Sequence, residues 1–281
     1  MTKAITIREL LALAEQSILS IDTARLDVEV LLSHSLGMDR ASLYASPERE
    51  VPEGIVSNFN FQLKKRKDCY PIAYLVGNKE FWSLELNVNQ HTLIPRPETE
   101  CLVEAALELI REKQTVEILD MGTGSGAVAL ALAKERPESR VLAVDVSGDA
   151  LVIAKKNARL HQLSNIEFLQ SDWFTALKDK QFDMILSNPP YVESNDNGFI
   201  SGEIRHEPRL ALDGGPDGMK AISQLIPNAI GYLKPLGYLI LEHGYRQAEG
   251  IRQIFLTNRY QNVAVRQDYA GLDRVSIAQW P

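Results

Sequence analysis

The stretch that decides the fold is Val116-Glu117-Ile118-Leu119-Asp120-Met121-Gly122-Thr123-Gly124-Ser125-Gly126. A short apolar strand candidate, residues 116–119, runs into three glycines at alternate positions, and a helical run follows from Ala127 to Lys134. Glycines let the backbone turn tightly and approach a ligand that a Cβ would displace. The G-x-G-x-G spacing differs from the dinucleotide pattern G-x-G-x-x-G, so the pyrophosphate argument does not transfer directly. A merely structural strand-to-helix turn therefore remains an alternative.

Strand and helix candidates alternate on both sides of this loop. The apolar strand candidates of this region are residues 116–119, 141–144, 166–169, 182–186 and 238–241. Helical runs separate most of them, which predicts right-handed βαβ units on a mostly parallel sheet covered on both faces. Two last candidates, residues 263–266 and 275–278, flank a turn with Gly271 and predict a closing antiparallel hairpin. The expected class is a doubly wound α/β fold.

The first part of the chain has a different pattern. Residues 1–75 look helical: Thr6 and Glu9 have capping-box spacing, and later apolar runs repeat with a helical period. The basic cluster Lys64–Lys67 is interpreted either as a binding patch or as the solvated last turn of a helix. Residues 76–95, where apolar and polar residues alternate, are predicted to be a linker with a hairpin. A catalytic domain is expected over residues 96–281.

Composition restricts the classes of function. The net charge of -7 and pI near 5.4 argue against a long electrostatic footprint on nucleic acid, so we expect no stable nucleic-acid binding. Cys69 and Cys101 are too few for a disulfide framework and lack the clustering of a zinc site, so no metal is expected. Without a signal-peptide block or an apolar run long enough to span a bilayer, the sequence predicts a cytoplasmic protein with no membrane partner.

Ligands of such sheets bind beyond the carboxyl ends of the strands, so residues there are candidate ligands. Asp145 ends the second strand candidate, where a carboxylate can accept hydrogen bonds from both ribose hydroxyls, although it could instead cap the next helix. Asp172 and Trp173 follow the third strand candidate. Asp172 could accept from an adenine amino group and Trp173 could pack on the ring, while a buried core Trp is the alternative. Together these residues predict a nucleoside site.

The fourth strand candidate runs into Asn188-Pro189-Pro190-Tyr191. Two prolines after a strand fix φ and remove two backbone donors, which leaves carbonyls exposed. Exposed carbonyls suit a substrate with N–H groups. An amide or aryl amine has a delocalised lone pair, so an enzyme that transfers a methyl group to it must hold both N–H groups and aim the nitrogen at that methyl group. The Asn188 side-chain oxygen and the Pro189 carbonyl can accept those bonds, and the Tyr191 ring can pack on the planar group. Positioning by acceptors in a dry site can carry such a reaction without a metal.

These residues resemble the amino-methyltransferases of the class I fold, including those that act on adenine. Further motifs are similar to the HemK/PrmC-type release factor glutamine methyltransferases: Pro71–Gly77, Glu80–Trp82, Leu93–Glu100, Glu207–Gly215 and Asp268–Arg274. The resemblance covers nearly the whole chain, including its helical part. Several motifs in one order make chance similarity improbable.

The resemblance implies a seven-stranded sheet with a reversed last strand and S-adenosylmethionine as the methyl donor, which leaves as S-adenosylhomocysteine. It implies that the acceptor is the glutamine nitrogen in the Gly-Gly-Gln motif of class 1 peptide chain release factors, which residues 1–75 would dock. Carried over by position, the donor-binding residues would be Gly122, Thr123, Gly124, Ser125, Gly126, Asp145, Asp172, Trp173 and Asn188. The glutamine would lie against Asn188, Pro189, Pro190 and Tyr191, of which Asn188, Pro189 and Tyr191 would serve catalysis.

Some questions stay open at this level. Arg96 and Glu98 are interpreted as facing the donor's methionine end or the substrate, or as a surface ion pair. The long connection 193–218 is expected to be a loop that covers the substrate. A nucleic-acid adenine methyltransferase is the alternative enzyme, and a noncatalytic module that binds adenosylmethionine is the alternative from another class. The acidic balance disfavours the first, and the retained Asn188–Tyr191 run disfavours the second.

Overall fold

The computed structural model describes residues 5–110 and 115–281, and they form two compact units. The first unit is the chain up to Gly77 together with Gly202–His206, and the second is Asn78–Ser201 with Glu207–Pro281. The first four residues of the predicted helical domain lie outside the described residues. Within the described ranges, no helix is long and apolar enough to cross a membrane.

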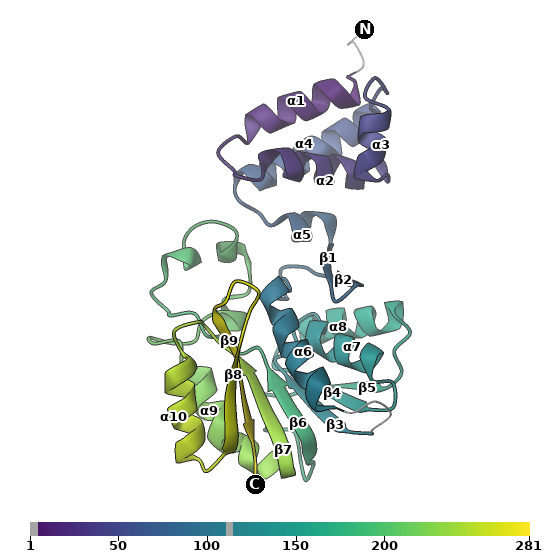
Figure 1. Ribbon diagram of the computed structural model, residues 1–281. Helices are drawn as coiled ribbons and strands as arrows, with labels where there is room; N and C mark the ends of the chain where they lie inside the picture. Colours follow the sequence, from purple (N-terminus) through teal and green to yellow (C-terminus); the bar gives the residue numbers. More distant parts are fainter. Residues whose placement is uncertain (1–4, 111–114) are drawn as a thin grey trace. The chain divides into compact units, whose positions relative to one another are not determined.

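The first unit is built from helices, as its periodicity predicts (Figure 1). Its helices are α1 (Ile7–Ser17), α2 (Ala24–Leu36), α3 (Arg40–Ala45), α4 (Glu53–Lys67), α5 (Ile72–Val76) and the 3-10 turn η3 (Ile204–His206). The expected capping box is present, because the Thr6 side chain accepts from the Glu9 N–H while Glu9 accepts from the Thr6 N–H at 3.0 Å. This reciprocal bonding satisfies donors that the first helical turn leaves unpaired.

Apolar side chains of α1, α2 and α4 meet in one core, with Leu31 and Phe59 wholly buried. A buried ion pair lies beside it: Arg66 Nε is 2.6 Å from Asp27 Oδ2, and Arg66 Nη1 is 2.8 Å from Glu203 Oε1. Removing one partner of such a pair leaves an uncompensated buried charge, which is strongly destabilising. Arg66 therefore serves the structure of this unit. In the 64–67 cluster the lysines are exposed and Arg66 is buried, so the two interpretations stay open for the lysines alone.

The second unit begins with a hairpin of β1 (Asn78–Phe81) and β2 (Leu84–Asn87), in the region where alternation predicts one. Trp82 and Ser83 form its turn, both with φ of 53°, as two-residue hairpin loops with a primed turn require. Asn157 fixes the hairpin to the following domain, since its side-chain oxygen accepts from the Asn87 N–H at 2.7 Å.

A seven-stranded sheet follows, in the order β5-β4-β3-β6-β7-β9-β8. The strands are β3 (Glu117–Met121), β4 (Arg140–Asp145), β5 (Ile166–Gln170), β6 (Phe182–Ser187), β7 (Leu233–Glu242), β8 (Gln261–Gln267) and β9 (Asp273–Gln279). The strands from β5 to β7 pair in parallel, and β9 is antiparallel to both of its neighbours. The predicted doubly wound sheet with a closing antiparallel hairpin is confirmed.

Helices cover both faces of this sheet (Figure 1). One face carries α6 (Glu100–Leu109), α7 (Ala127–Glu135) and α8 (Gly148–Leu160), and the other carries α9 (Lys220–Ala229) and α10 (Ala248–Thr257). Side chains alternate between the two cores along each strand, so that Ile118 packs with α6 and α7 while Leu119 packs with α9 and α10. Burial on both faces explains why the central strands are apolar throughout.

The remaining short turns are η1 (Pro97–Thr99) before α6, η2 (Asn197–Phe199) and η4 (Arg209–Ala211) in the long connection, and η5 (Ile230–Tyr232) after α9. Several elements extend past their predicted bounds. β7 begins at Leu233, five residues before the apolar run that predicts it, because parallel pairing with β6 continues past the bulge between Phe182 and Met184.

Candidate active site

The glycine loop lies between β3 and α7 and uses left-handed backbone conformations. Gly122, Gly124 and Gly126 have φ of +72°, +58° and +88°, which L side chains rarely adopt. A Cβ on Gly122 or Gly124 would meet open space, and both residues line a cavity. A Cβ on Gly126 would lie 3.0 Å from Leu130 Cδ1 and 3.3 Å from Ala154 Cβ. The first two glycines therefore give ligand access, while Gly126 permits close helix packing.

The side chains between the glycines stabilise the loop itself. Thr123 Oγ1 donates to Asp120 Oδ2 at 2.6 Å, and both residues are buried. Burial raises the pKa of the Asp120 carboxyl to about 6, against the opposing effect of the Thr123 hydrogen bond. Ser125 is also buried, and its carbonyl accepts from Asn157 Nδ2 at 2.9 Å. Thr123, Ser125 and Gly126 are not among the residues that line the cavity. A contact between these residues and the methyl donor therefore stays a prediction.

Asp145 closes the loop from the neighbouring strand. Its Oδ2 accepts from the Gly124 N–H at 2.9 Å, and its Oδ1 accepts from the Ser147 N–H at 2.8 Å. Ser147 caps α8 by accepting from the Ala150 N–H, so the alternative of Asp145 as the helix cap is wrong. Burial raises the pKa of the Asp145 carboxyl, while its backbone donors lower it. The carboxylate thus joins β4 to the glycine loop and also lines the cavity.

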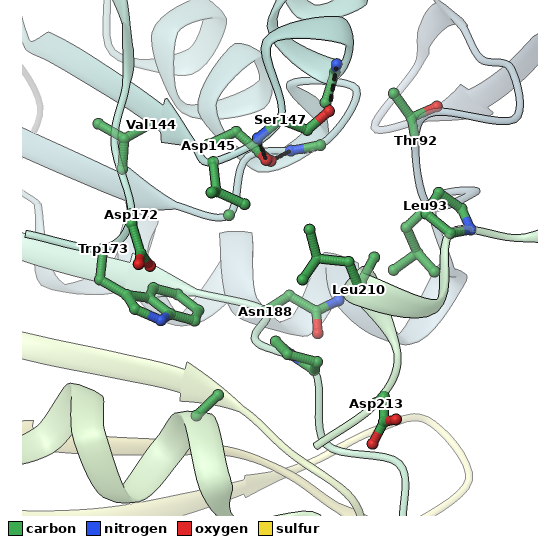
Figure 2. Close-up of a pocket in the computed structure, with 18 of the residues that line it drawn as sticks. Thr92, Leu93, Val144, Asp145, Ser147, Asp172, Trp173, Asn188, Leu210 and Asp213 are labelled. Carbon is green, nitrogen blue, oxygen red and sulfur yellow. Dashed lines mark hydrogen bonds between the residues drawn. The ribbon is translucent and has the colours of Figure 1, made fainter. Parts of the chain in front are cut away.

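The cavity beyond these strand ends has a volume of about 420 Å³, within the usual range of small-molecule sites. Figure 2 shows Asp172 and Trp173 on one side, Thr92 and Leu93 on the opposite side, and Asn188 between them. Its walls come from the strand ends, from the segment before α6, from the long connection and from α9. Predicted site residues on the walls are Gly122, Gly124, Asp145, Asp172, Trp173, Asn188 and Pro190.

Trp173 is half-buried, between the two interpretations made from the sequence. It lines the cavity and also packs against the core beneath α9 and α10. Its φ of 47° is unusual for a bulky residue, which places the backbone after β5 in a specific turn. Asp172 lies on the same wall and is exposed. A carboxylate beside a half-buried indole at this position could hold an adenine ring.

The Asn188–Tyr191 run leaves β6 at the centre of the site. Ser187 Oγ donates to the Met121 carbonyl at 2.7 Å, which fixes the end of β6 against β3. Asn188 and Pro190 line the cavity, whereas Pro189 and Tyr191 are not among its lining residues in the described chain. The Tyr191 hydroxyl donates to Glu242 Oε1 at 3.1 Å, and the Tyr191 carbonyl accepts from Gln247 Nε2 at 3.1 Å.

The second half of the long connection also reaches the cavity. Pro208, Leu210, Ala211 and Asp213 line it, and an isolated parallel bridge pairs Val192 with Asp213. Because these residues cover one side of the cavity, the expected role of the connection as a substrate cover stays the preferred interpretation.

A buried carboxylate fixes this connection to the segment before α6. Glu207 Oε2 accepts from the Ile94 N–H at 3.0 Å, and Glu207 Oε1 pairs with Arg96. Arg96 therefore pairs with an interior partner and not with Glu98, which is exposed. The interpretation of Arg96 and Glu98 as a surface ion pair is wrong.

Sequence reasoning missed several lining residues. Those from the segment before α6 and from α9 are Gln90, His91, Thr92, Leu93, Lys220, Ala221 and Gln224. The Leu93–Glu100 motif gave a hint of the first group, but no local pattern marks α9 as a wall. Across residues 5–110 and 115–281, no group of His, Cys, Asp and Glu is arranged to hold a metal ion.

A doubly wound sheet with a reversed strand β9, and a glycine loop and an acidic residue at neighbouring strand ends, defines a class I methyltransferase. A crystal structure of a methyltransferase from Pyrococcus furiosus has the same fold, with a TM-score of 0.53, 21% identity, and coverage of 79% of this chain and 98% of that one. Residues 99–215 match the family model of the methyltransferase small domain, and residues 9–77 match that of the PrmC N-terminal domain.

Curated relatives give the particular family. The chain is 44% identical over 276 residues to the release factor glutamine methyltransferase of Aliivibrio fischeri, covering 96% of both chains. It is also 44% identical to the enzyme of that name from Escherichia coli, over 92% of this chain and 93% of that one. The chain therefore belongs to the release factor glutamine methyltransferase family. This membership, with the fold, implies S-adenosylmethionine as the methyl donor.

Replacing Asp145 with Ala is expected to lower donor affinity about tenfold to a hundredfold, because hydrogen bonds to a charged group contribute roughly 1.5 to 3 kcal/mol. Calorimetric titration with S-adenosylmethionine measures this. Asp149→Ala, which removes an exposed carboxylate four residues further along the chain, in the first turn of α8, is the matched control and should keep wild-type affinity. An unchanged dissociation constant for the Asp145 variant would remove this residue from the donor site.

Proposed function

We propose that the protein methylates the side-chain amide nitrogen of the glutamine in the Gly-Gly-Gln motif of class 1 peptide chain release factors. The observation that carries the proposal is the position of Asn188, which leaves β6 beside the glycine loop and lines the same cavity. The curated relatives, similar over nearly the full chain, act on release factor glutamine by name. A planar amide with two N–H groups fits acceptors at this point.

The residues present fit the donor. Gly122 and Gly124 leave open space where a Cβ would otherwise project into the cavity, so the backbone can approach a bound nucleoside closely. Asp145 would accept from the ribose hydroxyls, Asp172 would accept from the adenine amino group, and Trp173 would pack on the ring. S-adenosylmethionine supplies an electrophilic methyl group on sulfur when bound.

The protein's part in the chemistry is to position and polarise the amide. The Asn188 side-chain oxygen and the Pro189 carbonyl would accept its two N–H groups, which aims the nitrogen at the methyl group. Positive charge develops on that nitrogen during transfer, so the same bonds strengthen in the transition state. Pro208, Leu210 and Ala211 from the long connection would shield the reacting atoms from water.

Labelling identifies the substrate class. Methyl-labelled S-adenosylmethionine is incubated with the protein and one of four acceptors: a class 1 release factor, the same factor with its motif glutamine changed to glutamate, DNA, or RNA. Label should enter only the unmodified factor. A glutamate carboxylate has no N–H for Asn188 and Pro189, and a site that pairs both hydrogens rejects an isostere without them by about 10⁴ or more.

Two results would contradict the proposal. Label in DNA or RNA would favour an adenine methyltransferase. Label in the glutamate variant would show that another residue is the acceptor.

Asn188→Ala is expected to lower kcat by roughly 10²- to 10³-fold, by analogy with the loss of one transition-state hydrogen bond. The rate is measured with saturating donor and release factor. Asn228→Ala, which removes an exposed amide from α9, is the matched control and should keep normal turnover. Near-normal kcat in a folded Asn188 variant would sink the proposed role.

The helical unit is proposed to dock the release factor. Removing residues 1–75 should spare donor binding but raise KM for an intact release factor far more than for a short Gly-Gly-Gln peptide. A melting curve checks that the shortened protein is folded. Equal changes in KM for both substrates would mean that the helical unit stabilises the catalytic domain and does not contact the partner.

A further inference from the structure

A buried polar chain lies behind Asn188 and takes no part in the chemistry described so far. Asn188 Nδ2 donates to Thr99 Oγ1 at 3.2 Å. Thr99 is 4% exposed and stands at the N-cap position of α6, where a Thr side chain usually accepts from the first helical turn. Here it makes no capping bond. Its hydroxyl is therefore committed to partners other than its own helix.

The second partner of Thr99 is Glu242, at the end of β7. The Thr99 hydroxyl is near enough to this carboxylate to lower its pKa, which favours the charged form. Glu242 is 1% exposed, and its Oε1 accepts from the Tyr191 hydroxyl at 3.1 Å. Its Oε2 has no partner of regular hydrogen-bond geometry among the described residues. An unpaired buried acceptor is costly, and the Thr99 hydroxyl is the neighbouring donor that can reduce this cost.

The direction of each hydrogen bond in this polar chain follows from the chemistry of Tyr191 and Glu242. The Tyr191 hydroxyl donates its single hydrogen to Glu242, and Arg274, which lowers the pKa of Tyr191, is a donor only and cannot accept that hydrogen. An ionised carboxylate only accepts, so Thr99 must donate its hydrogen to Glu242. Thr99 Oγ1 then has only lone pairs for Asn188, which must present its NH₂ group. The amide oxygen of Asn188 is left for the cavity.

We propose that Thr99 and Glu242 are positioning residues that set the direction of the Asn188 amide, so that its oxygen faces the substrate nitrogen. The proposal rests on the proposed function, in which that oxygen accepts a substrate N–H. If the Asn188 amide were reversed, its NH₂ group would face the NH₂ group of the substrate, which would place two donors together without an acceptor. The same carboxylate also holds Tyr191, so one buried anchor on β7 orients both ends of the Asn188–Tyr191 run.

Protonation of Glu242 would remove this control. Burial raises the pKa of the Glu242 carboxyl to about 7, with Thr99, Tyr191 and Arg274 acting in the opposite direction and the charge of Glu98 adding to the rise. A protonated carboxyl can donate to Thr99, which can then donate to the oxygen of Asn188. The Asn188 amide is therefore expected to keep a single direction above pH 7, and kcat should fall as the pH drops through about 7.

Three ionisable groups near Glu242 have raised pKa values. The pKa of Tyr191 is raised by burial and by the Glu242 charge, and that of Arg274 is raised by Tyr191 and Asp268. The pKa of the Cys101 thiol is raised by burial and by nearby carboxylates that include Glu242. The three groups keep their protons near pH 7, so a change of kcat there that is lost in Glu242→Gln belongs to Glu242.

The kinetic test compares Thr99→Val, which keeps the shape but removes the hydroxyl, with Thr99→Ser, which keeps it. Misplacing a catalytic group costs up to about 10²-fold, so Thr99→Val should lower kcat roughly 10- to 100-fold with little change in KM. Thr99→Ser should restore most of that loss. Tyr260→Phe removes another buried hydrogen bond of the same unit, from Tyr260 to the Ile226 carbonyl, and should leave kcat unchanged.

Glu242→Gln should lower kcat and abolish its fall below pH 7, because the new amide can donate to Thr99 at every pH. Wild-type kcat in a folded Thr99→Val protein, equal losses in both Thr99 variants, or a retained pH dependence in Glu242→Gln would each overturn the proposal.

A second measurement needs no substrate. In protein labelled with ¹⁵N on asparagine, the side-chain signal of Asn188 is the one lost in Asn188→Ala. It should shift with a midpoint near pH 7 in the wild type and stay constant in Glu242→Gln and Thr99→Val. A wild-type signal that does not change with pH would refute the proposal that Thr99 and Glu242 set the direction of the Asn188 amide. Absence of methyl transfer to any release factor with this titration intact would instead refute only the proposed function.

Discussion

Parallel pairing of β3 with both β4 and β6 is the constraint on which the site depends. Met121 is in register with Val144 on one side and with Ser187 on the other. The next residues of these strands, Gly122, Asp145 and Asn188, therefore emerge side by side at one edge of the sheet, although the chain separates them widely. Backbone hydrogen bonds set this spacing, so the glycine loop and Asn188 line one cavity.

The site also requires carboxylates in places where charge is costly. Asp120 and Glu242 are almost wholly buried, and burial raises the pKa of each, to about 6 and about 7. Each one is retained beside a specific donor: Thr123 hydrogen-bonds to Asp120, and Tyr191 hydrogen-bonds to Glu242. Buried carboxylates that are held by such hydrogen bonds specify one arrangement of the surrounding side chains, at some cost in stability.

Much of this arrangement could be predicted from sequence, because it follows from local patterns. Apolar strands that end in Gly122–Gly126, Asp145 and Asn188 predict the sheet and the contents of its edge. The proposed positioning role of Thr99 and Glu242 could not be predicted. The local sequence indicates only a helix cap at Thr99 and the end of a strand at Glu242. Thr99 comes near Glu242 through long-range packing, because α6, which begins directly after Thr99, lies against β7. For the same reason the wall supplied by α9 and the partner of Arg96 were missed.

A crystal structure of the protein with S-adenosylhomocysteine and a Gly-Gly-Gln peptide tests the central claim most directly. The account predicts that the glutamine side-chain nitrogen lies about 2.7 to 3.2 Å from the Asn188 side-chain oxygen and the Pro189 carbonyl, and that it faces the donor sulfur. A glutamine bound elsewhere, or one whose nitrogen faces the NH₂ group of Asn188, would contradict it.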